Sequence, residues 1–294
     1  MWTGIDILIP IQEFRLQYPF LQDFFTAVSS KAVYLALPMM IAMAFFWYID
    51  KRKGDIISLS FIPAMAFAKS LKYIIAQPRP WVLDPNIIEV PGANANGLSC
   101  PSGHTAITSA SLIPASLMVR KVVSIVLIVI LILVIAARLV LCAHTPLDII
   151  VGLLVGLCSA AVAWKAADIS LRNDFCFYSV CLAYSAILTI IAVIALTTFG
   201  ADPADVATYM GFLYGMMIGR ALEHRYVHYE VRESAAKDKA IGYLVGMIAG
   251  AAILAIPSLI IPEFGRAVGG FLMMLWCFTA YPYLLMRKDR PEGR

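Results

Sequence analysis

The sequence predicts an all-α membrane protein, a polytopic bundle of about nine transmembrane helices. Of its 294 residues, 61% are hydrophobic and 14% are charged, whereas soluble domains carry about 25% charged residues. The mean hydropathy is +0.81, and apolar runs recur at lengths near the roughly 20 residues that cross a hydrocarbon core. We place these runs at about 33–50, 55–76, 104–119, 122–142, 146–166, 175–199, 205–222, 240–261 and 264–286.

The segment before the first span, residues 1–32, is expected to lie at the extracytoplasmic surface. Its first 25 residues mix Trp, Phe, Ile and Leu with charged residues, which is typical of an amphipathic stretch at a membrane interface. Neither a basic region nor a small-residue cleavage site is present there, so we expect no removable signal peptide.

Basic residues gather in the loops on one side of the predicted bundle, which hold 16 of the 23 lysines and arginines. The positive-inside rule places that side in the cytoplasm, with the N-terminus outside and the C-terminus inside. Because these residues flank spans and form no single patch, we expect no nucleic-acid partner. They are Lys51, Arg52, Lys53, Arg120, Lys121, Lys165, Arg172, Arg220, Arg225, Arg232, Lys237, Lys239, Arg287, Lys288, Arg290 and Arg294.

The second span ends in the polar sequence "KSLKYIIAQPRPW". Pro78 disfavours helical geometry at the residue before it, so the helix should end near Ala76, with Lys72 on its last full turn. Arg79 is held between two prolines and can fold back toward Lys72, where the two cations could bind an anion. The alternative is that they reach the interface as snorkelling side chains, which we expect of Lys69.

The third span opens with "PSGHT". Ser102 suits the N-cap of a helix, whose first amides can then receive an anion. Gly103 lets a ligand approach the backbone closely, and an apolar helix start gives His104 little reason to be there without a function. For Ser102, capping alone and a hydrogen bond to phosphate are equally open.

The fourth span ends and the fifth begins within "ARLVLCAHTPLDII". Thr145 at the N-cap, Pro146 at the first helical position and Asp148 at the third form a capping arrangement. Asp148 can also reach one ring nitrogen of His144, which would leave the other nitrogen basic. Asp148 could cap the helix, orient His144, or do both. Arg138, earlier in the fourth span, has no acidic residue of that span to pair with.

These polar sequences should meet on one face of the bundle, because successive spans run in opposite directions. The cluster holds three cations, a helix N-terminus, two histidines and one carboxylate, a set that suits phosphate. It lacks the carboxylates that Mg²⁺ chemistry requires and the three or four ligands that zinc requires. We therefore expect phosphate chemistry with no metal and no cofactor.

Three motifs in this order resemble the signatures of the type 2 phosphatidic acid phosphatase family. Each motif is weak alone, but three in register are specific, and the resemblance covers about residues 55–166. One departure is Ala137, where the family usually has serine, which would remove one hydrogen-bond donor to phosphate. The motifs are Lys72-x6-Arg79-Pro80, Pro101-Ser102-Gly103-His104 and Arg138-x5-His144-x3-Asp148.

The resemblance implies a role for each matching residue. His144 would attack phosphorus and form a phosphohistidine, with Asp148 orienting its ring. His104 would protonate the leaving oxygen and then activate water. The phosphoryl oxygens would be bound by Lys72, Arg79, Ser102, Gly103 and Arg138.

The resemblance also implies a phosphatase core of about six helices, which we place at residues 33–200, followed by a C-terminal transmembrane extension at 201–294. The site would open to the extracytoplasmic side, bordered by the loop from Trp81 to Cys100. Cys100 and Cys142 both fall near this face, which leaves a disulfide between them open.

Three glycines in the seventh span, Gly211, Gly215 and Gly219, are spaced for close helix packing. The sequence leaves two partners open for them, another helix of the same chain or a second copy in a homodimer.

These features predict an integral membrane enzyme that hydrolyses a lipid phosphate or diphosphate at the outer leaflet. We expect broad specificity, with undecaprenyl diphosphate slightly ahead of phosphatidate, phosphatidylglycerophosphate and sphingoid-base phosphates. The related vanadium haloperoxidases are soluble, which the nine spans argue against. A non-catalytic lipid-phosphate binder or transporter has no need of His144 and Asp148 together.

Overall fold

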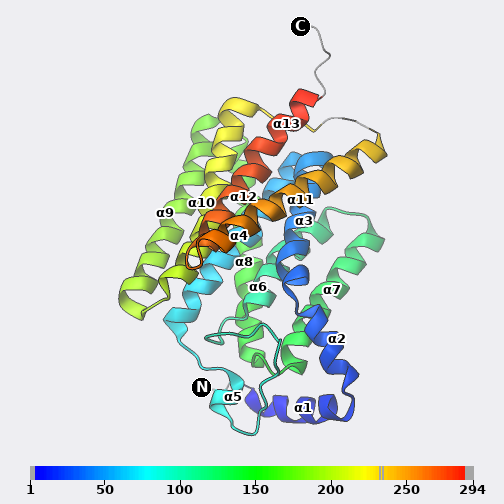
Figure 1. The fold of residues 1–294 in the computed structure, drawn as a ribbon, viewed down its shortest axis with the longest axis vertical. Helices are drawn as coiled ribbons and strands as arrows, with labels where there is room; N and C mark the ends of the chain where they lie inside the picture. Colours follow the sequence, from blue (N-terminus) through cyan, green and yellow to red (C-terminus); the bar gives the residue numbers. More distant parts are fainter. Residues whose placement is uncertain (1–3, 232, 234, 289–294) are drawn as a thin grey trace.

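The computed structural model describes residues 4–231, 233 and 235–288, and every regular element among them is a helix (Figure 1). The all-α class is therefore confirmed. Arg232, Arg290 and Arg294 of the predicted basic loops lie outside the described residues. The elements are η1 Ile5–Ile7, α1 Leu8–Gln17, α2 Phe20–Val28, η2 Ala32–Ala36, α3 Leu37–Ala44, η3 Phe45–Ile49, α4 Lys51–Ile75, α5 Pro80–Leu83, α6 Gly103–Leu117, α7 Lys121–Val140, α8 Pro146–Ser170, α9 Asp174–Phe199, α10 Pro203–Leu222, η4 Glu223–Val227, α11 Ala236–Ile260, α12 Gly265–Leu275, η5 Trp276–Ala280 and α13 Tyr281–Lys288.

By length and composition, seven helical segments of the described chain could cross a membrane. The polytopic bundle is thus confirmed, with a lower count than the nine spans predicted. Two predicted spans are not among the seven: α6 has only 15 residues, and α10 carries an acidic and a basic residue within its 20. The first span also begins earlier than predicted. The seven are Phe20–Ile49, Lys51–Leu83, Lys121–Val140, Pro146–Ser170, Asp174–Phe199, Ala236–Ile260 and Gly265–Arg287.

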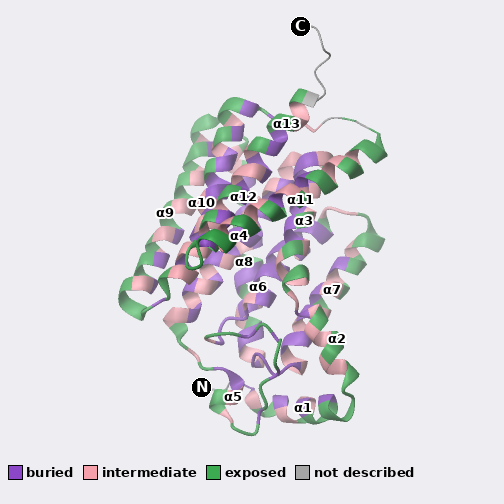
Figure 2. Cartoon of the chain, viewed as in Figure 1, coloured by how far each residue is buried: buried purple, intermediate pink, exposed green. Residues whose placement is uncertain are grey.

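The short helix α6 lies inside the bundle, which explains its composition. It packs against α4, α7 and α8, and almost all of its residues are buried (Figure 2). The hydroxyls of Thr108, Ser109 and Ser111 donate to backbone carbonyls one turn earlier, so they need no partner outside the helix. A helix that its neighbours shield from lipid can therefore be short and polar.

Two glycines of α8 bring this helix close to α6. A methyl group on Gly152 would lie 2.6 Å from the Ser102 carbonyl oxygen, and one on Gly156 would overlap Ser109. The Ser102 amide donates to the Asp148 carbonyl oxygen at 2.9 Å. The N-terminal ends of α6 and α8 are therefore held against each other, which positions the second and third motifs.

The glycines of α10 pack within the chain. A side chain on Gly211 would overlap Ala267 of α12, and one on Gly215 would overlap Phe271 of the same helix. Of the two partners that the sequence left open for this stripe, the structure shows the intrachain one.

An ion-pair network joins α10 to the start of α4, at the end of α4 that lies away from the motifs. Arg220 donates to both carboxylate oxygens of Asp55, at 2.7 and 2.8 Å, and pairs with Glu223, which also binds Lys51 at 2.7 Å. A cavity of about 410 Å³ lies beside this network. The lysine and the arginines that line it are all paired with carboxylates, and the pairs Lys51–Glu223 and Arg220–Asp55 join α4 to α10 and η4.

Candidate active site

The three motifs lie at one end of the bundle, next to the N-terminal helices α1 and α2 (Figure 1). The local expectations about helix ends are confirmed. Helix α4 ends at Ile75 with Ala76 in a left-handed conformation at its C-cap, Ser102 caps α6, and Thr145 and Asp148 form a capping box on α8. These ends bring the polar residues of all three motifs to one place.

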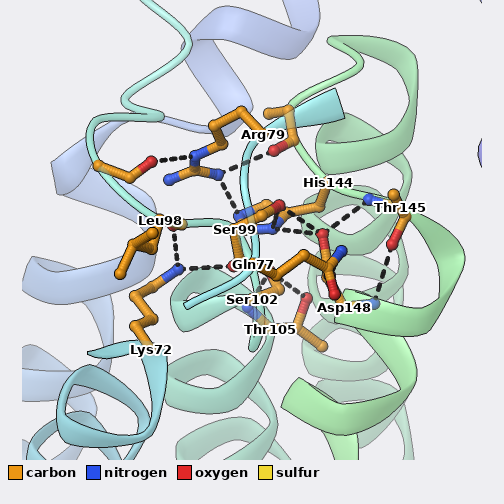
Figure 3. Close-up of polar contacts among 12 residues, drawn as sticks. Lys72, Gln77, Arg79, Leu98, Ser99, Ser102, Thr105, His144, Thr145 and Asp148 are labelled. Carbon is orange, nitrogen blue, oxygen red and sulfur yellow. Dashed lines mark hydrogen bonds and ion pairs between the residues drawn. The ribbon is translucent and has the colours of Figure 1, made fainter. Parts of the chain in front are cut away.

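His144 and Asp148 form a buried pair (Figure 3). His144 Nδ1 lies 3.3 Å from Asp148 Oδ2, and the other ring nitrogen, Nε2, lies 3.1 Å from Arg79 Nη1. Because a guanidinium can only donate hydrogen bonds, Nε2 must accept, and the proton of the neutral ring belongs on Nδ1. Asp148 therefore both caps α8 and faces His144, and the Nε2 lone pair accepts from Arg79, a bond that must be given up before this nitrogen can attack.

Two residues that the sequence analysis missed also hold the Asp148 carboxylate. Ser99 Oγ donates to Oδ2 at 2.5 Å, and Gln77 Nε2 donates to Oδ1 at 2.9 Å (Figure 3). The Thr145 amide adds a bond to Oδ2 at 2.9 Å. The signal for both was their position, since Gln77 is a polar residue inside the first motif and Ser99 lies two residues before the second.

Lys72 and Arg79 both bind the loop that precedes α6. Lys72 Nζ donates to the carbonyl oxygens of Ser99 and Leu98, at 2.7 and 2.9 Å. Arg79 donates to the carbonyl oxygens of Asn96 and Gly97, at 2.8 and 2.9 Å, and to that of Ala143 at 2.8 Å. Lys72 thus uses two of its three N–H groups, and Arg79 uses four of its five once its bond to His144 is included. Each cation therefore keeps one N–H for a phosphate oxygen.

Burial excludes the snorkelling alternative for Lys72 and Arg79 but leaves it open for Lys69. Lys72 and Arg79 are buried, with 9% and 6% of their surfaces exposed. Lys69, which we expected to snorkel, is half-exposed and pairs with Asp205 of α10 at 3.0 Å. An acidic residue 136 positions away in the sequence supplies this partner, so the second span alone could not reveal it.

Arg138 is fully buried near the end of α7. Its Nη1 donates to Ser29 Oγ and, at 2.6 Å, to the Ala93 carbonyl oxygen. Among the described residues, Nε and Nη2 have no hydrogen-bond partner. These two nitrogens form the edge of the guanidinium that can bind two oxygens of one phosphate. Buried donors without partners are costly, and a bound anion would satisfy them.

The second motif presents a hydroxyl, an open backbone and a histidine. Ser102 Oγ accepts from Thr105 Oγ1 at 3.0 Å, which leaves its own hydrogen free to donate. A methyl group on Gly103 would meet nothing within 4 Å, so there is space beside the backbone. His104 Nε2 lies 3.1 Å from the Ser29 carbonyl oxygen, and its ring lies against Tyr34, with 3.7 Å between centroids.

The neighbouring charges converge on His144. Burial lowers the pKa of His144 well below its usual 6.5, and the charges of Arg79, Lys72, Arg138 and His104 lower it further. The structure thus brings the cations of the first and third motifs within electrostatic reach of one imidazole. With this pKa, His144 is neutral at physiological pH, as a nucleophile must be.

The lowered pKa predicts the acid side of the pH profile. Because His144 stays unprotonated as the pH falls through 6.5, we expect the acid limb of kcat/KM to lie below that value. The measurement is the rate of phosphate release as a function of pH. The substrate phosphate also titrates, near pH 6 for monoesters, so its pKa is measured separately and its contribution is removed from the profile. His224→Gln, at the other end of the bundle, should show the same profile. An acid limb at or above pH 6.5 would contradict the assignment.

The cysteines near this site are thiols. Cys100 and Cys142 are both free, so the disulfide that the sequence left open is not formed. Burial, followed by the charge of Asp148, raises the pKa of Cys100 to about 12, which keeps this thiol protonated and unreactive. Among the residues that the structure describes, no three His, Cys, Asp or Glu side chains gather where they could hold a metal ion.

Comparison with protein families gives two matches. A family model described as "PAP2 superfamily" matches residues 54–172, and one described as "PAP2 superfamily phosphatase, transmembrane extension" matches residues 207–289. Together they cover more than half of the chain, and the first contains every residue of the three motifs. No curated protein and no solved structure matches the chain.

Proposed function

This chain belongs to the PAP2 superfamily, and we propose that it hydrolyses the phosphate or diphosphate ester of a membrane lipid through a phosphohistidine on His144. The superfamily assignment makes it a phosphatase, and the seven candidate spans among its described residues make it an integral membrane protein. The observation that carries the proposed reaction is the neutral His144, whose Nε2 lone pair lies beside Arg79 while Asp148 holds Nδ1.

In the first step, the Nε2 lone pair of His144 attacks phosphorus. The bond between phosphorus and the lipid oxygen breaks, and His104 gives its proton to that leaving oxygen. The phosphorylated imidazole carries positive charge, which the adjacent Asp148 carboxylate offsets. Lys72, Arg79 and Arg138 bind the phosphoryl oxygens, since phosphoryl transfer depends mainly on positioning and electrostatic stabilisation.

In the second step, His104 takes a proton from water while the water oxygen attacks phosphorus. The bond from phosphorus to Nε2 breaks, which releases phosphate and restores the neutral His144. His104 serves as acid in the first step and base in the second, so the two steps return it to its starting protonation state.

The donor set supports a reaction without metal. The site contributes three cations, the first amides of α6 and a single carboxylate, and this carboxylate accepts bonds from Ser99, Gln77 and Thr145. A Mg²⁺ or two-metal mechanism needs several carboxylate ligands. The cations supply the charge stabilisation that a metal would otherwise give.

For the substrate we propose a broad range of lipid phosphates, with a polyprenyl diphosphate as the first to test. The proposed phosphate-binding groups would contact only phosphoryl oxygens, which all of these lipids share. The loop from Trp81 to Cys100 borders the site, and Arg79 lies 6.0 Å from the Trp81 ring, so this loop is placed to contact the rest of the headgroup.

We further propose that the site faces the extracytoplasmic side. Lys51 and Arg52, which belong to the predicted cytoplasmic loops, lie at the start of α4. Lys72 and Arg79 of the site lie at or just beyond the other end of the same helix, and so on the opposite side of the membrane. On α1, which covers the site, Leu8, Gln12 and Arg15 are buried while Phe14 and Leu16 are exposed. The exposed face of α1 also carries Glu13 and Gln17, so it mixes apolar and polar side chains, as a segment at a membrane interface can.

The test is phosphate release by the purified protein in detergent with EDTA, on a panel of polyprenyl diphosphate, phosphatidate, phosphatidylglycerophosphate and sphingoid-base phosphate. We expect release from several of these lipids and no loss of rate with EDTA. For the side of action, intact cells expressing the wild type should hydrolyse a membrane-impermeant short-chain lipid phosphate, and cells expressing His144→Ala should not.

Each part of the proposal has its own contrary outcome. Loss of activity with EDTA that Mg²⁺ or Zn²⁺ restores would remove the metal-free mechanism. Strict preference for one lipid would remove the broad specificity. Tight binding of lipid phosphates without any release would identify a binder or transporter instead.

A further inference from the structure

We propose that Ser29, in the N-terminal segment, is a positioning residue of the active site that holds both Arg138 and His104. The inference rests on the proposed function and adds a residue that belongs to none of the three motifs. Ser29 also precedes both segments that match the family models, residues 54–172 and 207–289. The N-terminal segment, which the sequence analysis placed at the surface as an amphipathic stretch, would therefore complete the site.

The helix end at Ser29 places both of its polar groups inward. Ser29 is the C-cap residue of α2, its amide donates to the Phe25 carbonyl oxygen at 2.9 Å, and it is completely buried. The last carbonyls of a helix have no partner within the helix. The Ser29 carbonyl is thus free to accept from His104 Nε2 at 3.1 Å and from Asn94 Nδ2 at 3.4 Å.

The Ser29 hydroxyl fixes one corner of the Arg138 guanidinium. It accepts from Nη1 and is itself 3.5 Å from the Ala93 carbonyl oxygen, to which it donates. The Ala93 carbonyl oxygen also accepts from Nη1 directly, at 2.6 Å. Both hydrogens of Nη1 are therefore used, and the three remaining N–H groups lie on the Nε and Nη2 edge.

The two hydrogen bonds at Nη1 set the direction in which the other two nitrogens, Nε and Nη2, point. A guanidinium is planar and rigid, so two bonds at Nη1 determine where Nε and Nη2 point. These nitrogens are buried and have no partner among the described residues. The long arginine side chain has many rotamers, and without the Ser29 hydroxyl the Ala93 bond would be the one hydrogen bond left to orient the guanidinium among the described residues.

The Ser29 carbonyl fixes the proposed acid in the same way. Its bond to Nε2 and the contact with Tyr34 hold the His104 ring from two directions. Because the carbonyl accepts from Nε2, the proton that His104 gives to the leaving oxygen is carried on the other ring nitrogen, Nδ1. One residue thus links a phosphate-binding cation to the residue that moves the proton.

The experiment compares three variants by kcat, KM, the inhibition constant of inorganic phosphate and the thermal unfolding midpoint. Ser29→Ala removes the hydroxyl but keeps the carbonyl, Ser29→Thr keeps both, and Ser30→Ala is the matched control at the next position. For Ser29→Ala we expect KM and the phosphate inhibition constant to rise about tenfold to a hundredfold, the usual effect of losing a hydrogen bond to a charged group. The unfolding midpoint, Ser29→Thr and Ser30→Ala should stay close to wild type.

A double-mutant cycle separates positioning from general stability. Arg138→Lys lacks the Nε and Nη2 edge, so adding Ser29→Ala to it should raise the phosphate inhibition constant by less than about twofold. Equal effects of Ser29→Ala in both backgrounds, or no effect in the wild-type background, would overturn the inference. If the wild type releases phosphate from no lipid, the proposed function fails, and calorimetric binding of inorganic phosphate to the same variants still decides the role of Ser29.

Discussion

Replacing His144 with alanine is expected to abolish phosphate release, with a fall in kcat on the order of 10⁴-fold or more, as for other catalytic nucleophiles. Nε2 of this residue is the atom proposed to attack phosphorus. Asp148 holds the other ring nitrogen, and Arg79 lies beside Nε2. Alanine leaves the three cations in place, so lipid phosphate should still bind.

The direct measurement is a rapid quench with a lipid labelled on its phosphate. Wild-type protein should carry label that acid removes and alkali does not, the behaviour of a phosphorus–nitrogen bond, and His144→Ala should carry none. His224→Ala is the matched control, because His224 pairs with Asp174 at the other end of the bundle. Full labelling of His144→Ala would place the nucleophile elsewhere.

Replacing Asp148 with asparagine is expected to lower kcat on the order of 10² to 10⁴-fold while KM changes little. Oδ1 accepts from Gln77, and Oδ2 accepts from Ser99, Thr145 and His144. An amide NH₂ would oppose a donor at either position. At Oδ2 it would also shift the ring proton of His144 to Nε2, which removes the attacking lone pair, as in hydrolases whose orienting Asp is replaced.

Asp202→Asn is the control for this substitution. Asp202 caps α10 by accepting from the amides of Ala204 and Asp205, and asparagine caps helices equally well. Its kcat and unfolding midpoint should match the wild type. A kcat for Asp148→Asn within threefold of the wild type would show that the carboxylate only caps α8.

Local chemistry made the helix ends predictable. The end of α4 near Ala76 and the caps at Ser102 and Thr145 depend on residues within a few positions of each other. The number of spans was less predictable, because whether α6 contacts lipid depends on α4, α7 and α8 around it. The serines and threonines of α6 make the helix less apolar although it is buried. A prediction that counts apolar runs therefore cannot tell whether such a helix faces lipid.

The motif residues of the candidate site were visible in the sequence, and their supporting contacts were not. Lys72, Arg79, Arg138 and His144 stand out as polar residues at the ends of apolar spans. Ser29 reaches Arg138 across 109 positions, and no local pattern connects two such residues. Contacts of this kind arise from the packing of the N-terminal helices, which follows only from the folded chain.

The junction between α6 and α8 bears on how the enzyme finishes a turnover. Because the Ser102 amide is bonded to the Asp148 carbonyl oxygen, two helix N-termini, each with about half a positive charge, meet beside three cations and one carboxylate. Free phosphate offers these groups the same oxygens as a lipid headgroup. We therefore expect free phosphate to inhibit the enzyme, and any preference for the lipid over its product to come from the apolar tail held in the bilayer.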